Sequence, residues 1–243
     1  MSTVLIIGAT SDIGFATAKK FAANGFNIQL AGRETSILEP MCSDIAIRYN
    51  VICTTHKFDV TLFDTHEQFF HSLATKPTVT VCVVGYMKDN EMVIKSQAET
   101  LTTINSNYAG PVSILNIISA YYASQQNGTI VGISSVAGLR GRQSNYIYGS
   151  AKAGFTAYLS GLRNKLFESK VHVVTVLPGF VNTKMTADLN LPKLLTAQPE
   201  DVGNAIFNAV KKKKNTIYVK WFWRWIMLII VSVPEFIFKK KKL

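Results

Sequence analysis

The sequence contains little cysteine and no cluster of metal-binding side chains. Its three cysteines, Cys42, Cys53 and Cys82, are odd in number and form no CxxC pair, and its four histidines are scattered. These patterns indicate neither a disulfide framework nor a zinc site. We therefore predict a reducing compartment and no bound metal.

A secretory leader and a membrane-spanning run are also lacking. Met1 is followed almost directly by the strand-like run Val4–Gly8, without a basic region or a cleavage site. The longest charge-free stretch near the C-terminus, Trp225–Pro234, would extend about 15 Å as a helix, against about 30 Å of bilayer hydrocarbon. We expect a cytoplasmic protein.

Acidic residues are almost absent from the last part of the chain. Residues 211–243 contain nine lysines, Arg224 and a single glutamate, and they carry all but about two units of the net charge of +11. Basic charge confined to a segment rich in Trp, Phe and Ile indicates an anionic membrane surface rather than nucleic acid, which needs basic grooves or base-stacking platforms. We therefore predict no nucleic-acid partner.

The first 210 residues alternate short apolar runs with helix-length segments, without an internal repeat. Strands are predicted near 3–8, 26–31, 51–58, 78–84, 128–134, 171–177 and 216–219. Helices are predicted near 13–24, 35–49, 62–75, 99–125, 146–169 and 199–212. This order predicts an α/β fold of the Rossmann-like, doubly wound type, with a parallel seven-stranded sheet and helices on both faces.

A glycine-containing turn follows the first predicted strand. Gly8 and Gly14 bracket it, and a helix begins within it. Backbone amides and a helix N-terminus in this position can hold a pyrophosphate, although such a turn alone is also common in proteins that bind no nucleotide.

A tyrosine and a lysine four residues apart provide a second signal. The spacing places Tyr148 and Lys152 on one face of a predicted helix, and Ser135 lies at the end of the fifth predicted strand. A neighbouring cation lowers the pKa of a tyrosine, which allows it to exchange protons near neutral pH. The Tyr–Lys pair alone could be an exposed helix pair, and the serine alone could belong to an ordinary turn at a strand end. Their occurrence together, in this order after the glycine turn, indicates an active site.

Taken together, these motifs resemble the short-chain dehydrogenase/reductase family along essentially the whole chain. The matching segments are Gly8–Gly14, Asp59-Val60, Val84-Gly85, Asn107, Ser134-Ser135, Tyr148–Lys152 and Pro178–Thr183. One departure is Asp12, which stands where the family has a middle glycine and puts the geometry of the turn in question.

The resemblance implies an NAD(P)-dependent oxidoreductase and a role for each matching residue. It implies that Asn107 holds a bent helix and a relay water and that Ser135 orients the substrate carbonyl. Tyr148 would donate the proton, and Lys152 would bind the nicotinamide ribose and lower the Tyr148 pKa. Asp59 would contact the adenine, Gly85 the adenosine ribose and Thr183 the carboxamide. The complete implied cofactor-binding set is Gly8, Thr10, Ser11, Ile13, Gly14, Arg33, Asp59, Val60, Gly85, Tyr148, Lys152, Pro178, Gly179, Val181 and Thr183.

The choice between NADH and NADPH depends on the loop after the second strand. Arg33 stands there in place of a carboxylate, which favours the 2′-phosphate of NADPH, and Glu34 follows directly. We predict NADPH as the preferred cofactor, with NADH as a possible alternative.

A narrower resemblance concerns the substrate. The segment Ser134–Gly138 with Arg140 and Arg142, the segment Asn145–Tyr148, Met185 and the hydrophobic ending are similar to the decaprenylphosphoryl-2-keto-pentose reductases. This resemblance implies reduction of a ketone on a polyprenyl-phosphate-linked sugar, an NADH-using enzyme and a partner oxidase subunit. A reductase of a lipid ketone, such as a ketosphinganine or long-chain ketoacyl group, and a catalytically idle membrane-docked binding protein remain alternatives.

The composition changes near residue 211, and we divide the chain into a domain of residues 1–220 and a tail of residues 221–243. The tail has lysines on both sides and three tryptophans at its start, Trp221, Trp223 and Trp225. These features favour peripheral attachment to the inner face of the membrane. Because the tail lacks a polar face, burial in a homo-oligomer interface is the alternative.

Overall fold

Seven parallel strands form the central sheet of this computed structural model, which describes residues 2–187 and 191–241. The strands follow the order β3-β2-β1-β4-β5-β6-β9, which confirms the predicted sheet. Their bounds are β1 Thr3–Ile7, β2 Asn27–Gly32, β3 Cys53–Lys57, β4 Val79–Cys82, β5 Thr129–Ile133, β6 His172–Pro178 and β9 Thr216–Val219. The order reverses between β1 and β4, the point at which open α/β sheets bind ligands.

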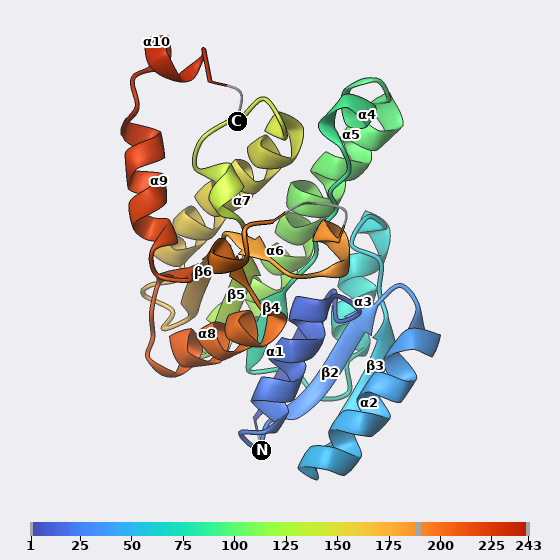
Figure 1. Cartoon of the computed structure of the whole chain (residues 1–243). Helices are drawn as coiled ribbons and strands as arrows, with labels where there is room; N and C mark the ends of the chain where they lie inside the picture. Colours follow the sequence, from blue (N-terminus) through green and yellow to red (C-terminus); the bar gives the residue numbers. More distant parts are fainter. Residues whose placement is uncertain (1, 188–190, 242–243) are drawn as a thin grey trace.

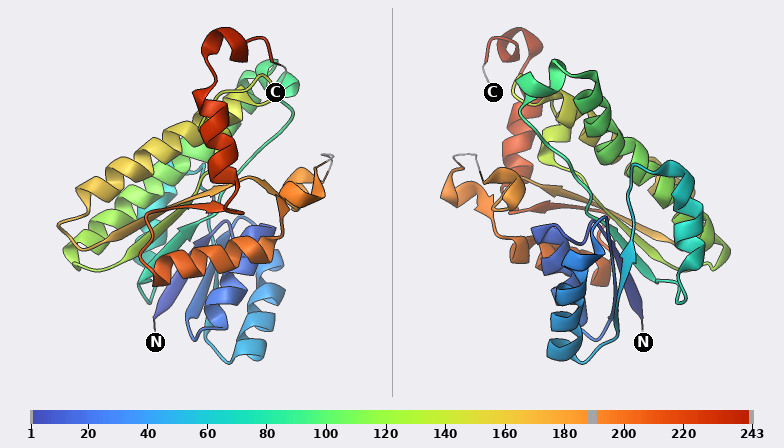
Figure 2. Two further views of the ribbon diagram at one scale, coloured as in Figure 1. Left: turned by 60° about the vertical axis from the view of Figure 1, so that its left-hand side comes forward. Right: turned by 90° about the vertical axis from the view of Figure 1, so that its right-hand side faces the viewer.

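Helices cover both faces of the sheet (Figures 1 and 2). The helices α1 (Asp12–Ala22), α2 (Thr35–Tyr49) and α8 (Pro199–Lys211) pack on one face, and α3 (His66–Ser72), α6 (Gly110–Ser124) and α7 (Tyr146–Lys165) pack on the other. Alternation along β1 produces the two layers, because Val4 and Ile6 enter the first core while Leu5 and Ile7 enter the second. Continuous apolar strands are therefore buried on both sides.

The segment predicted as one helix over 99–125 has an irregular centre. It consists of α5 (Gln97–Ile104), a π-helical stretch over Asn105–Ala109 and then α6. A Cβ on Gly110 would lie 2.2 Å from the carbonyl oxygen of Val60, so only glycine allows the helix to approach the segment after β3 this closely. The helix predicted over 62–75 is shorter, since a 3₁₀ turn over Phe63–Thr65 precedes α3, and the short helix α4 (Asn90–Ile94) was not predicted.

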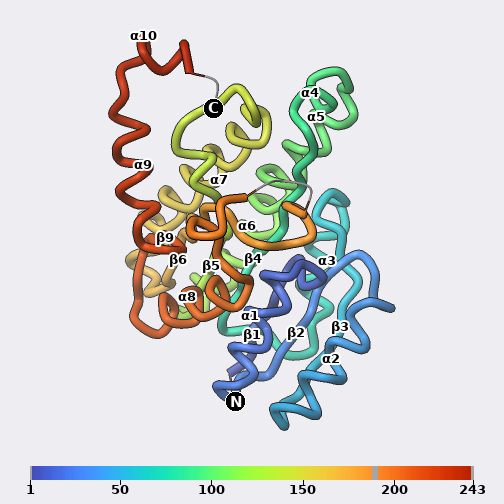
Figure 3. Tube along the Cα trace, in the orientation of Figure 1, coloured from blue at the N-terminus to red at the C-terminus, as the bar shows by residue number. Residues whose placement is uncertain are grey.

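The C-terminal tail packs against the domain (Figure 3). Its helix α9 (Trp223–Ser232) buries Trp223 and Met227 against Val136 and Leu177, and α10 (Glu235–Phe238) follows. Arg140 contacts this segment by donating hydrogen bonds to two tail carbonyls and forming an ion pair with Glu235. No helix in the described part of the chain is both long and apolar enough to cross a bilayer.

Candidate active site

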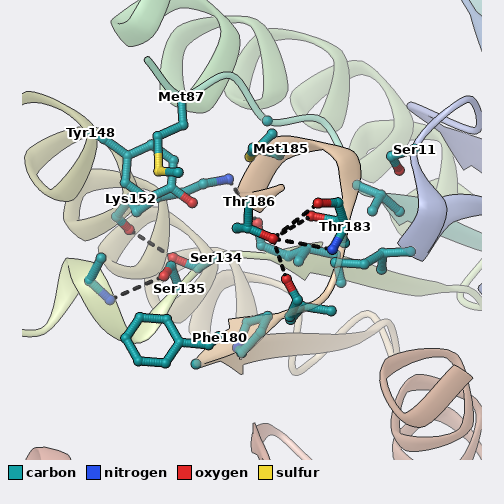
Figure 4. Close-up of a pocket in the computed structure, with 18 of the residues that line it drawn as sticks. Ser11, Met87, Ser134, Ser135, Tyr148, Lys152, Phe180, Thr183, Met185 and Thr186 are labelled. Atoms are coloured by element: carbon teal, nitrogen blue, oxygen red, sulfur yellow. Dashed lines mark hydrogen bonds between the residues drawn. The ribbon is translucent and has the colours of Figure 1, made fainter. Parts of the chain in front are cut away.

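The first wall of the site forms where β5 ends against α7. Ser134 at this end donates a hydrogen bond to the Lys152 carbonyl over 2.9 Å, which joins the strand to the helix. The Ser135 hydroxyl accepts a hydrogen bond from the Ala137 amide at the start of a 3₁₀ turn. Figure 4 shows both serines facing Tyr148 and Lys152 across a short gap. The structure thus brings together the predicted serine, tyrosine and lysine.

Lys152 is almost completely buried, with 2% of its surface exposed. Its ammonium donates hydrogen bonds to the carbonyl oxygens of Ile133 and Val84 over 3.0 and 3.3 Å. Burial lowers the pKa of Lys152 to about 8, because the charged form loses hydration. The amine therefore titrates close to neutral pH and lies at the carboxyl ends of β4 and β5.

Tyr148 lies one helical turn before Lys152, as the spacing predicts. Burial raises the pKa of the Tyr148 hydroxyl to about 12, and a hydrogen bond with Ser135 opposes this rise. The Lys152 nitrogen lies 5.8 Å from the centre of the tyrosine ring and is turned toward the backbone carbonyls. The contact with Ser135 offsets only part of the rise in the Tyr148 pKa, and the lowering of that pKa by Lys152 stays a prediction.

Asn107 lies behind this wall, fully buried in the π-helical stretch. Its amide nitrogen donates to the carbonyls of Tyr86 and Thr103 over 2.6 and 2.9 Å, and its oxygen accepts from the Tyr86 amide. The two bonds with Tyr86 tie the irregular helix to the loop after β4, and the bond to Thr103 lies within the helix. Asn107 thus lies at the irregular centre of this helix, and its implied roles in holding the bend and a relay water stay predictions.

The glycine turn between β1 and α1 has the geometry of an anion-binding loop. Gly8 has a φ of +89°, and a Cβ on Gly14 would lie 2.7 Å from the Gly8 carbonyl oxygen. The Ser11 hydroxyl donates to that same carbonyl and accepts from the Gly14 amide. Asp12 does not disturb this arrangement, because its carboxylate accepts a hydrogen bond from the Lys184 amide over 2.8 Å. The turn therefore fits a pyrophosphate at the start of α1.

A second wall lies opposite, in the segment after β6. It contains the two-residue strand β7 (Phe180–Val181), which pairs with β8 (Thr196–Ala197), and a short turn whose first amide is capped by Thr186. A Cβ on Gly179 would lie 2.0 Å from the Trp223 indole, so the tail packs directly on this wall. The Trp223 indole also donates to the Leu195 carbonyl.

The two walls enclose a cavity of about 360 Å³. The predicted residues that line it are Thr10, Ser11, Ile13, Gly85, Ser135, Tyr148, Lys152, Pro178, Gly179, Val181 and Thr183. Lining residues that had no predicted role include Asp12, Val84, Met87, Phe180, Arg142 and Asn145. Helix spacing and a strand end indicated Tyr148, Lys152 and Ser135, the glycine turn indicated its own residues, and the family resemblance supplied the rest of the first group.

Six predicted residues lie outside the cavity lining. Gly8, Gly14 and Asn107 support it from behind through the contacts described above. Arg33 is exposed directly after β2, and Asp59 uses a carboxylate oxygen to accept bonds from the amide and hydroxyl of Thr61. Val60 is buried beside Asp59. The cavity thus joins the glycine turn to the Tyr148 wall and includes Gly85, whereas Arg33, Asp59 and Val60 lie outside it; their contacts with a cofactor stay predictions.

Comparison with known proteins establishes the family. The sequence profile described as short chain dehydrogenase matches residues 2–193. The chain belongs to the short-chain dehydrogenase family. It is also 30% identical over 240 residues to an uncharacterized oxidoreductase of Mycobacterium tuberculosis, covering 98% of this chain and 96% of the relative. The enzyme is therefore an oxidoreductase of this family, as predicted.

More distant relatives agree with the fold. A 3-oxoacyl-[acyl-carrier-protein] reductase of Chlamydia trachomatis is 28% identical and covers 77% of each chain. The solved short-chain dehydrogenase of Sphingobium yanoikuyae, in complex with NADPH, has a TM-score of 0.85 at 21% identity and covers 97% of each chain. A 3-oxoacyl-[acyl-carrier protein] reductase of Brucella melitensis, in complex with NAD, has a TM-score of 0.82 at 21% identity, covering 91% of this chain and 96% of the other.

Proposed function

We propose that this short-chain dehydrogenase reduces a ketone, with Tyr148 as the proton donor. The observation that carries the proposal is the convergence of Ser135, Tyr148 and Lys152 on one wall of a single cavity. Ser135 orients the carbonyl oxygen, and Tyr148 transfers its proton to that oxygen. A bound nicotinamide would supply the hydride to the carbonyl carbon. Preservation of all three groups argues against a catalytically idle binding protein.

The cofactor is NADPH in preference to NADH. Arg33 is exposed at the end of β2, beside the glycine turn, since a Cβ on Gly32 would lie 3.4 Å from the Thr10 methyl group. A guanidinium in this place attracts a 2′-phosphate. The Arg33→Ala enzyme should bind NADPH about ten-fold more weakly or worse and NADH almost unchanged, measured by fluorescence titration. Equal losses for both cofactors would show that Arg33 does not recognise the 2′-phosphate.

The substrate is the keto group of a polyprenyl-phosphate-linked sugar. Support comes from the chemistry of the cavity, in which the polar side chains of Arg142 and Asn145 line the same space as Tyr148. A pocket for a long acyl chain would be apolar throughout its substrate end. The similarity to 3-oxoacyl reductases keeps reduction of a lipid ketone as the second candidate.

Mass analysis can separate these two substrates. The enzyme and NADPH are incubated with extracted membrane lipids, and products that gain two hydrogens are identified. We expect a phosphate-linked sugar lipid among them, and no such gain with the Tyr148→Phe enzyme. Selective reduction of ketoacyl or ketosphinganine species would favour the second candidate.

We further propose that the enzyme attaches to an anionic membrane through the outer face of its tail. Trp225, Leu228 and Ile229 are at least half exposed on α9, on the side away from the buried Trp223. The basic end of the tail provides positive charge beside them, as an interfacial helix requires. The tail and the active site occupy the same end of the molecule, beyond the carboxyl ends of the strands (Figure 1). A lipid-linked substrate could thus be reached from the membrane surface.

Vesicle sedimentation tests this attachment. Replacing Trp225, Leu228 and Ile229 together with serine should abolish sedimentation with vesicles that contain anionic phospholipid. A matched control replaces Ile47 and Ile52, which are exposed on the opposite end of the domain, and should sediment like the native protein. If neither variant changes sedimentation but the tail variant dissociates an oligomer, the tail forms a subunit interface.

A further inference from the structure

Arg142 is a partly buried cation at the substrate end of the cavity, and its side chain has no partner among the described residues. It lies in the turn before α7, and its side chain lines the same space as Ser135 and Tyr148. Within residues 2–187 and 191–241, its Nε is buried and has no hydrogen-bond partner. None of the ion pairs in that part of the chain includes Arg142. A guanidinium that loses hydration without gaining a partner destabilises the free protein.

Other partly buried arginines of this protein are satisfied. Arg140, two residues away, pairs with the Glu235 carboxylate over 2.7 Å and donates to two carbonyls. Arg163 donates to the carbonyls of Val173 and Asn215 and to the Thr175 hydroxyl. The contrast indicates that the partner of Arg142 comes from outside the described chain.

Asn145 adds an acceptor to the same place. Its side-chain oxygen is buried without a partner in the described residues, although it stands at the N-terminus of the twenty-residue helix α7. The side chain makes no capping bond, and the first turn of α7 contains no acidic residue. The positive end of the helix dipole is therefore not neutralised, which favours an anion in front of it.

We propose that Arg142 and Asn145 form a subsite for a phosphate ester of the substrate and a hydroxyl group beside it. The planar guanidinium matches two phosphate oxygens, and the Asn145 oxygen accepts from the hydroxyl. The pyrophosphate of a dinucleotide would occupy the other end of the cavity, because Ser11 and the glycine turn lie across from Tyr148 (Figure 4). This inference rests on the proposed ketone reduction for its substrate, and it assigns the phosphate to the vicinity of the reacting carbonyl.

Binding of glycerol phosphate tests the subsite without turnover. Calorimetry is performed on the full-length protein saturated with NADP⁺, so that the phosphate sites of the cofactor are filled. We expect Arg142→Gln to weaken glycerol phosphate binding at least ten-fold. Arg142→Lys should weaken it less, because lysine keeps the positive charge but lacks the two parallel N–H donors of the guanidinium. The control Arg48→Gln removes an exposed arginine of α2 and should match the native protein within two-fold.

Three results would overturn the subsite. They are equal affinities of native and Arg142→Gln protein, equal losses in Arg48→Gln, and an Arg142-dependent preference for glycerate, which would identify a carboxylate ligand. Retained NADP⁺ binding confirms that the variants are folded. If the protein reduces no ketone but Arg142→Gln weakens glycerol phosphate binding, the subsite stands and the proposed function is wrong. If the protein reduces a ketone but Arg142→Gln binds glycerol phosphate as the native protein does, the function stands and the subsite is wrong.

Discussion

The two walls of the cavity are built in different ways. The wall formed by β5 and α7 carries the reacting groups on regular elements, and buried hydrogen bonds such as that from Ser134 to Lys152 fix them. The wall after β6 is short and irregular, and contacts from distant segments, Asp12 and Trp223, hold it in place. Regular structure thus fixes the chemistry, whereas long-range contacts shape the space for the substrate. Substitutions in the first wall should affect the reaction rate, and those in the second should affect stability and local hydrogen exchange.

The largest effect is expected for the proton donor. Tyr148→Phe should lower kcat for ketone reduction by about 10² to 10⁴, because one positioned proton donor is lost. NADPH binding should change little. Tyr146→Phe is the matched control, since Tyr146 is exposed two residues earlier, and it should retain near-native activity. Comparable activities of the two variants in steady-state assays would remove Tyr148 from the mechanism.

Removing the tail contact should mainly affect stability. Trp223→Ala deletes a side chain that is 4% exposed, and large-to-small changes of this kind cost about 3 to 5 kcal/mol in unfolding free energy. Trp221→Ala should cost less than about 0.5 kcal/mol, because Trp221 is 74% exposed. Urea denaturation measures both. Similar losses would mean that α9 does not support the second wall.

The pH dependence distinguishes the two ionisable groups of the first wall. The pKa of Lys152 is lowered to about 8, so its positive charge is present below that pH and is lost as the pH rises through it. Tyr148, with a pKa raised to about 12, keeps its proton over the same range. We expect kcat/KM for reduction to fall about ten-fold per pH unit above pH 8.

Lys152→Arg provides the control for this profile. Arginine stays charged, so the fall above pH 8 should disappear even if the rate is lower. NADPH oxidation followed from pH 6 to pH 10 gives both profiles. A native profile that stays level up to pH 10 would contradict the role assigned to the Lys152 charge.

The smallest effect concerns the contact between the glycine turn and the second wall. Asp12→Ala removes the acceptor for the Lys184 amide and should increase deuterium exchange at residues 183–186 several-fold. Asp12→Asn keeps an acceptor oxygen and should have a weaker effect. Unchanged exchange in both variants would show that Asp12 does not hold this segment.

Much of the fold could be predicted because its strands are short apolar runs between helix-length segments. The apolar run Val4–Ile7, for example, predicts a central parallel strand, and in the structure this run is buried on both faces. The apolar pattern predicted one continuous helix over 99–125 and missed the π-helical stretch, and only the family resemblance pointed to a bend at Asn107, whose side chain bonds to the distant Tyr86 backbone. Ser135 could be placed at the sheet edge for the same reason as the strands, whereas the residues after β4 and β6 came from the family resemblance. The Asp12 and Trp223 contacts join segments far apart in sequence, and no local pattern reveals them.

The central claim, reduction of a ketone by this short-chain dehydrogenase, is tested most directly by isotope transfer. Native protein is incubated with NADPH carrying deuterium at the transferable position and with extracted membrane lipids, and the products are analysed by mass spectrometry. The account predicts an alcohol that carries one deuterium on the former carbonyl carbon, formed by native enzyme and not by Tyr148→Phe. Deuterium in no product, or the same yield from Tyr148→Phe, would contradict it.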